Sequence, residues 1–114
     1  MAVHLKKSYQ VLTEKVKMSV VIGDGQIGSS VIRLENQLLR MGDINDLEIG
    51  NGNDLIGKKL TVKSIVADVN DQTNYTSITY KLSGGKEEGN FKLEENVTND
   101  GDSIIYRAEI NFET

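Results

Sequence analysis

The chain has 114 residues, no cysteine, and a net charge of −4 from 13 Lys and Arg against 17 Asp and Glu. The lack of cysteine excludes a disulfide framework, a thiolate metal site and a thiol nucleophile. The basic residues are scattered, which argues against nucleic acid or an anionic membrane surface as the partner. This length suits one domain with one core.

The first 15 residues carry apolar side chains at helical spacing, at Leu5, Tyr9 and Leu12. This spacing predicts a short N-terminal helix or an irregular arm, whereas Tyr9 and Val11 would suit a strand. The body of the domain follows over residues 16–114. No apolar run typical of a signal peptide follows Met1, so we expect a soluble protein and prefer the cytoplasm for it.

Residues 16–22 alternate apolar and polar side chains, which predicts a strand with one exposed face. The motif Gly23-x-Gly25-x-x-Gly28 follows and has the spacing of the dinucleotide-binding fingerprint, which requires a helix directly after it. Residues 29–41 fit such a helix or a β-hairpin that turns at 35–37. The β-branched residues at the start of this segment favour the hairpin.

The stretch 60–82 predicts two long strands that pair as a hairpin around the polar turn 70–74. Its apolar residues move from even to odd positions near Lys63 and Ser64, which predicts a β-bulge there and an inward set continuing at Ile65, Ala67 and Val69. Before it, residues 43–49 predict an edge strand and residues 50–54 a loop.

The C-terminal part contains the clearest strand, in which Ile104, Tyr106, Ala108, Ile110 and Phe112 alternate with mostly polar residues. Phe91 and Leu93 mark another strand, and Gly, Asn and Asp clusters mark the turns at 83–89 and 99–102. Short strands with such turns predict an all-β fold, a single antiparallel β-sandwich of about seven or eight strands.

The loop inside 60–82 is the first candidate for binding, because it concentrates carboxylate, amide and phenol groups; these are Asp68, Asn70, Asp71, Asn74 and Tyr75. Asn and Asp oxygens of such loops can bind Ca²⁺ at a sandwich rim. Ordinary turn chemistry places the same residues there, so the sequence leaves a metal site open.

Catalysis has little support, because the only histidine, His4, lies near the N-terminus and carboxylates that are adjacent in a strand point to opposite faces. We therefore expect no enzyme, no catalytic residue and no cofactor. The preferred function is a structural, protein-interaction or assembly module that binds protein, either itself or another chain. The alternatives are a Ca²⁺- or ligand-binding module, and dinucleotide binding at the glycine motif.

Overall fold

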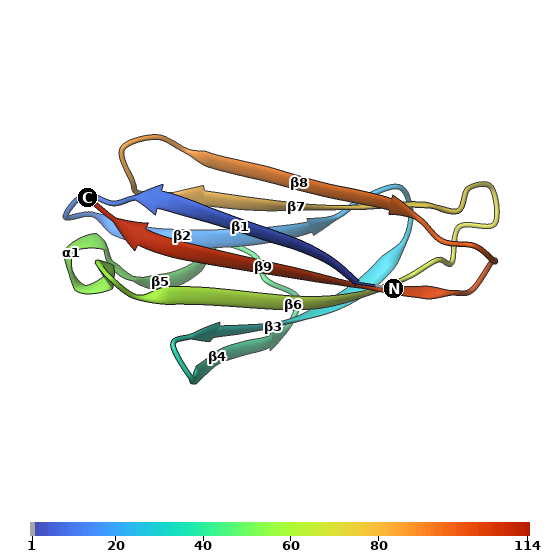
Figure 1. Cartoon of the computed structure of the whole chain (residues 1–114), viewed down its shortest axis with the longest axis horizontal. Coiled ribbons are helices and arrows are strands. Elements are labelled where there is room, and N and C mark those ends of the chain that lie inside the picture. The colour runs from blue at the N-terminus through green and yellow to red at the C-terminus, as the bar shows by residue number, and fades with distance from the viewer. Residues whose placement is uncertain (1) are drawn as a thin grey trace.

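The computed structural model describes residues 2–114, which form two β-sheets packed face to face (Figure 1). This confirms the predicted all-β sandwich. The described residues form one short helix, α1 (Gly52–Leu55), and nine strands, instead of about seven or eight. In chain order the strands are β1 (Ala2–Gln10), β2 (Lys15–Ile22), β3 (Ile27–Leu34), β4 (Gln37–Gly42), β5 (Leu47–Asn51), β6 (Lys59–Ala67), β7 (Tyr75–Ser83), β8 (Gly89–Asn96) and β9 (Ser103–Glu113).

The five-stranded sheet has the order β1-β9-β6-β3-β4 and lies in front in Figure 1; the four-stranded sheet has the order β5-β2-β7-β8. All neighbouring strands are antiparallel except β1 and β9, which run parallel. The molecule is elongated, with extents of 44 × 25 × 20 Å. No described helix is long and apolar enough to cross a bilayer.

The core lies between the sheets and is filled by every second side chain of the long strands. On β9 the predicted inward set is confirmed, because Ile104, Tyr106, Ala108, Ile110 and Phe112 are all buried. Val16 and Met18 of β2 are buried opposite them in the other sheet. Alternation of this kind is the reason that sequence alone gave the fold class.

The expectation of a helix or arm at the N-terminus is wrong. Residues 2–10 form strand β1, which pairs along its whole length with β9, from Ala2 opposite Ile105 to Gln10 opposite Glu113. Tyr9 is buried and packs edge-on against Phe112 at 6.4 Å between ring centroids. The segment is therefore part of the sandwich body, and Met1 lies outside the described residues.

The predicted hairpin over 60–82 is also wrong, because β6 and β7 belong to different sheets and the segment between them crosses from one sheet to the other. The pairing of β6 shows no register shift, so the expected bulge at Lys63 is absent as well. The strand keeps one inward set to its end, through Ser64 and Val66. Ile65 consequently points outward and is 49% exposed.

Residues 29–41 form the favoured hairpin of β3 and β4, so the helix alternative is wrong and the context required by the dinucleotide fingerprint is missing. Gly25 has a φ of +72°, and a Cβ there would meet the Asn70 side chain at 2.9 Å. The glycine therefore serves a tight turn packed against the next loop. Of the predicted loop 50–54, the first two residues end β5 and the others lie in α1.

Candidate functional site

The outer face of the five-stranded sheet carries a row of basic side chains drawn from four separate parts of the chain. His4 of β1 lies opposite Arg107 of β9, and Arg107 lies opposite Lys63 of β6. Lys63 in turn lies opposite Val31 of β3, two residues before Arg33. Side chains directly opposite each other on one face are about 5 Å apart at their Cβ atoms, so strand pairing gathers these groups into one surface.

We call this surface the basic face and define it by His4, Lys6, Arg33, Lys59, Lys63 and Arg107. The outward positions of β1, β9, β6 and β3 hold five Lys and Arg against two Glu, whereas the rest of the chain holds eight basic and fifteen acidic residues. The face is therefore positive on a protein that is negative overall.

Only part of this positive charge is compensated within the protein. Glu109 pairs with Lys59 at 3.3 Å and with Lys6 at 3.5 Å. Desolvation raises the pKa of the Glu109 carboxyl, but the hydrogen bond and charge of Lys59 and the charge of Lys6 outweigh it and hold the pKa below its ordinary value. Within residues 2–114, Arg33, Lys63 and Arg107 have no acidic group within ion-pair distance.

An open depression lies over this row of side chains. Its volume is about 630 Å³, and its walls include His4, Val31, Arg33, Lys63 and Arg107. Such a surface offers ammonium, guanidinium and imidazole donors around an apolar wall, which suits carboxylates attached to a partly apolar partner.

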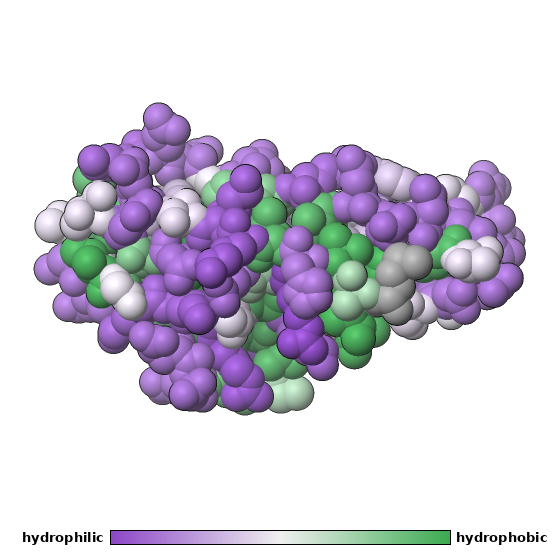
Figure 2. All heavy atoms as spheres, in the orientation of Figure 1, coloured by the Kyte–Doolittle hydropathy of each residue, from purple (hydrophilic) through white to green (hydrophobic). Residues whose placement is uncertain are grey.

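A band of exposed apolar side chains borders the basic face on the same side of the molecule. Its most exposed members are Ile27 at 60%, Met41 at 67%, Ile65 at 49% and Val69 at 53%. Ile105 and Val31 lie half-buried between them. Figure 2 shows hydrophobic side chains gathered in a band across this face, with hydrophilic ones on both sides. Contiguous apolar surface of this kind marks contact sites.

The opposite charge gathers at one end of the molecule. Three segments that meet there, 18–32, 64–80 and 93–106, contain seven acidic residues and no Lys or Arg. Their connecting loops project together at the right of Figure 1. We call the loops of these segments the acidic end. On the five-stranded sheet, Ile65 and Ile105 lie two residues nearer to these loops than Lys63 and Arg107 do.

The predicted binding loop lies at the acidic end, but its five residues do not form one site. Asn70 donates through Nδ2 to the Asp24 carbonyl at 2.9 Å, and the Tyr75 hydroxyl donates to Glu94 on β8. Asp68 is buried, Asp71 is exposed, and the Asn74 amide faces the loop after β8.

Gln26, inside the glycine motif, holds this loop in place. Its side-chain oxygen accepts from the Val69 and Asn70 amides at 2.7 and 2.9 Å, and its nitrogen donates to the Tyr75 carbonyl at 3.0 Å. The glutamine is buried, so these bonds replace water and fix the loop.

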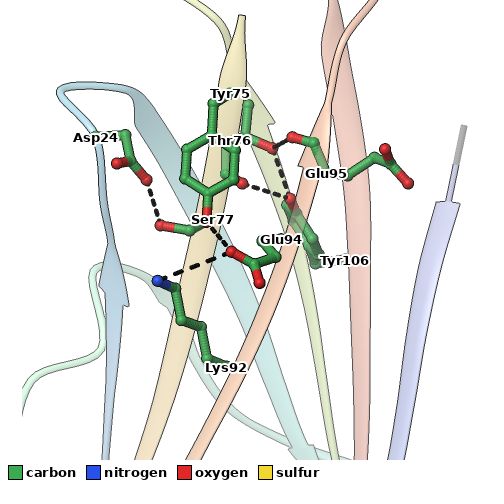
Figure 3. A network of polar contacts seen from close by, with 8 residues as sticks. All are labelled: Asp24, Tyr75, Thr76, Ser77, Lys92, Glu94, Glu95 and Tyr106. Carbon is green, nitrogen blue, oxygen red and sulfur yellow. Dashed lines mark hydrogen bonds and ion pairs between the residues drawn. The ribbon is translucent and has the colours of Figure 1, made fainter.

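A network of polar contacts continues from this loop along β7 and β8 (Figure 3). The Tyr106 hydroxyl lies 2.5 Å from Thr76 Oγ1, which donates to the Glu95 carbonyl at 2.7 Å. Ser77 donates to Asp24 at 2.5 Å. These bonds join β7 to β8, to β9 and to the turn after β2, so they hold the two sheets together at this end of the molecule.

Sequence reasoning missed the basic face because its members are far apart in the chain and only the register of β1, β9, β6 and β3 brings them together. It missed the apolar band for another reason. The predicted bulge turned Ile65 inward, whereas β6 alternates regularly to its end and keeps Ile65 on the outer face.

Searches against protein-family models, curated proteins and solved structures found no match for this chain.

Proposed function

We propose that this domain is a non-catalytic assembly module in which two copies pair through the outer faces of their five-stranded sheets. The observation that carries the proposal is the group of exposed apolar side chains on that face, which lies beside Lys63 and Arg107 on the side of the acidic loops; its members are Ile27, Met41 and Ile65. A two-fold symmetric contact places a surface patch against itself. With the band at the centre, the basic face of one copy lies over the acidic end of the other.

The charge pattern supports this arrangement over other ways of packing the same face. A contact with the strands aligned head to head would set Lys63 and Arg107 of both copies against each other, and like charges repel. When one copy is rotated by 180° relative to the other, Lys63 and Arg107 of each copy instead lie near the acidic end of its partner. The depression lined by Arg33, Lys63 and Arg107 then receives the loops of the partner's acidic end.

The size of the face is adequate for such a pair. Five strands about 4.8 Å apart and eight residues rising about 3.3 Å each cover roughly 600 Å² per copy. Two copies bury about 1,200 Å², the lower limit of specific interfaces. We therefore expect reversible association, with a dissociation constant on the order of 10⁻⁶ M.

Sedimentation velocity over a range of protein concentrations tests the proposal, with Ile65→Lys as the disruptive change and Val21→Lys as its control. Both residues are β-branched, point outward near the C-terminal end of their strands and have similar exposure, 49% and 43%, but Val21 lies on the outer face of the other sheet. We expect Ile65→Lys to be monomeric and Val21→Lys to pair like the original chain.

Charge reversal provides a second arm. Lys63→Glu acts twice in a symmetric pair, so at about 0.2–1 kcal/mol per exposed contact we expect pairing to weaken roughly two- to thirtyfold. High salt should weaken the original pair in the same direction. A chain that stays monomeric at low salt and high concentration, or equal effects of Ile65→Lys and Val21→Lys, would show the proposal to be wrong.

A further inference from the structure

Two loops at the acidic end are held together by their main chains. The Asp68 amide donates to the Asp102 carbonyl at 2.9 Å, and the Gly101 amide donates back to the Asp68 carbonyl at 3.1 Å. At the other end of the contact, the Val97 amide donates to the Asn74 carbonyl at 2.9 Å. The side chains between these bonds are therefore fixed close to one another by the backbone.

The Asn74 amide group lies between two carboxylates. With its NH₂ turned toward them, it donates to Asp68 Oδ2 at 2.9 Å and to Asp100 Oδ1 at 2.5 Å. The opposite orientation of the amide brings three oxygen atoms together at the same place. An asparagine side chain can present either its donors or its acceptor, because the two ends have nearly the same shape.

One oxygen of the Asp68 carboxylate lacks a hydrogen-bond partner within the described residues. Its side chain is only 3% exposed, and its Oδ1 has no hydrogen-bond partner among residues 2–114. A buried charged oxygen without a partner is costly, because the hydration that it loses is not replaced. Asp100, on the other side of the amide, is exposed and leaves the cluster open to solvent.

We propose that Asp68, Asn74 and Asp100 form a calcium site, in which the Asn74 amide turns its oxygen toward the ion. Ca²⁺ accepts carboxylate, amide and carbonyl oxygens together with water in flexible geometry, whereas Mg²⁺ requires a near-ideal octahedron. The described residues hold no group of three His, Cys, Asp or Glu at metal-binding distance. Two carboxylates and one amide therefore predict weak binding, with a dissociation constant on the order of 10⁻⁴–10⁻³ M.

The test is a thermal melt monitored by circular dichroism, in chelator-treated buffer, with CaCl₂ or MgCl₂ added to about 10 mM, above the expected dissociation constant. We expect Ca²⁺ to raise the melting temperature by several degrees and Mg²⁺ to do so much less. Asp100→Asn should abolish this rise. Asp71→Asn is the control, because Asp71 is exposed like Asp100 and lies in the neighbouring loop that carries Asp68 and Asn74, but is not one of the two carboxylates that the Asn74 amide reaches.

Asn74→Asp separates the calcium site from a simple amide bridge between carboxylates. A third carboxylate should tighten Ca²⁺ binding at least tenfold, measured by calorimetric titration, and lower the melting temperature in the absence of Ca²⁺. An unchanged melt with Ca²⁺, or an equal response of Asp100→Asn and Asp71→Asn, would overturn the proposal. Repeating the titration on Ile65→Lys keeps the result independent of association between copies.

Discussion

The two buried tyrosines of the core, Tyr80 and Tyr106, should respond in opposite directions to removal of the hydroxyl group. Both rings are fully buried. The Tyr106 hydroxyl bonds Thr76, whereas the Tyr80 hydroxyl makes no hydrogen bond within residues 2–114. Burial, and after it Tyr106, raises the pKa of Tyr80, and the Ser64 hydroxyl opposes this rise; Ser64 Oγ also pairs with Ser30 at 2.6 Å.

The magnitudes follow from these contacts. Tyr106→Phe loses one net hydrogen bond, about 1 kcal/mol, and Thr76 keeps its bond to the Glu95 carbonyl. Tyr80→Phe removes an unpaired buried polar group, which costs about 1–3 kcal/mol where it is present, so we expect a gain of roughly 1 kcal/mol. The two variants should then differ by about 2 kcal/mol, or roughly 8 °C in melting temperature.

Urea unfolding followed by far-UV circular dichroism measures both variants, and an unchanged dependence on urea concentration checks that only stability has changed. If Tyr80→Phe loses as much stability as Tyr106→Phe, the Tyr80 hydroxyl has a partner, and the reasoning from unpaired groups fails. That outcome would also weaken the parallel argument on Asp68.

Two further predictions concern pH and backbone packing. Burial raises the pKa of Tyr9, Tyr80 and Tyr106 above the ordinary value of 10.0. The stability that these neutral phenols contribute is therefore complete below pH 10 and is lost as the pH rises through their pKa values in the folded protein. Phenolate absorbance should rise together with unfolding. Gly84→Ala should cost several times more stability than Gly101→Ala in a urea melt. Both glycines have a positive φ, but a Cβ would meet the Lys15 carbonyl at 1.9 Å only at Gly84; equal losses would refute this.

The sequence predicted strands where one face is clearly apolar, and it failed where pairing depends on distant segments. Residues 2–10 resembled a helix because Leu5 and Tyr9 are four apart, yet the same residues also lie on one face of a strand. The choice is made by β9, whose exposed edge offers hydrogen bonds to a parallel partner about a hundred residues away in the chain. Periodicity within a short segment carries no information about such a partner.

The error at β6 is more instructive, because it concealed the surface on which the proposed function depends. Ile65, Ala67 and Val69 were expected to be inward, since apolar residues usually are, and a bulge was introduced to bring them inside. The strand instead keeps its register and leaves Ile65 and Ala67 on the outer face, and Val69, beyond its end, is 53% exposed. An apolar residue at an outward position of a regular alternation is better interpreted as an exposed contact residue than as evidence for a bulge.

The prediction of partners from net charge has a similar weakness. Basic residues that are scattered in sequence argued against any concentrated positive surface, but strand register collects Arg33, Lys63 and Arg107 within one face. The proposed partner, a second copy of the chain rotated by 180°, offers both signs of charge and the same exposed apolar side chains.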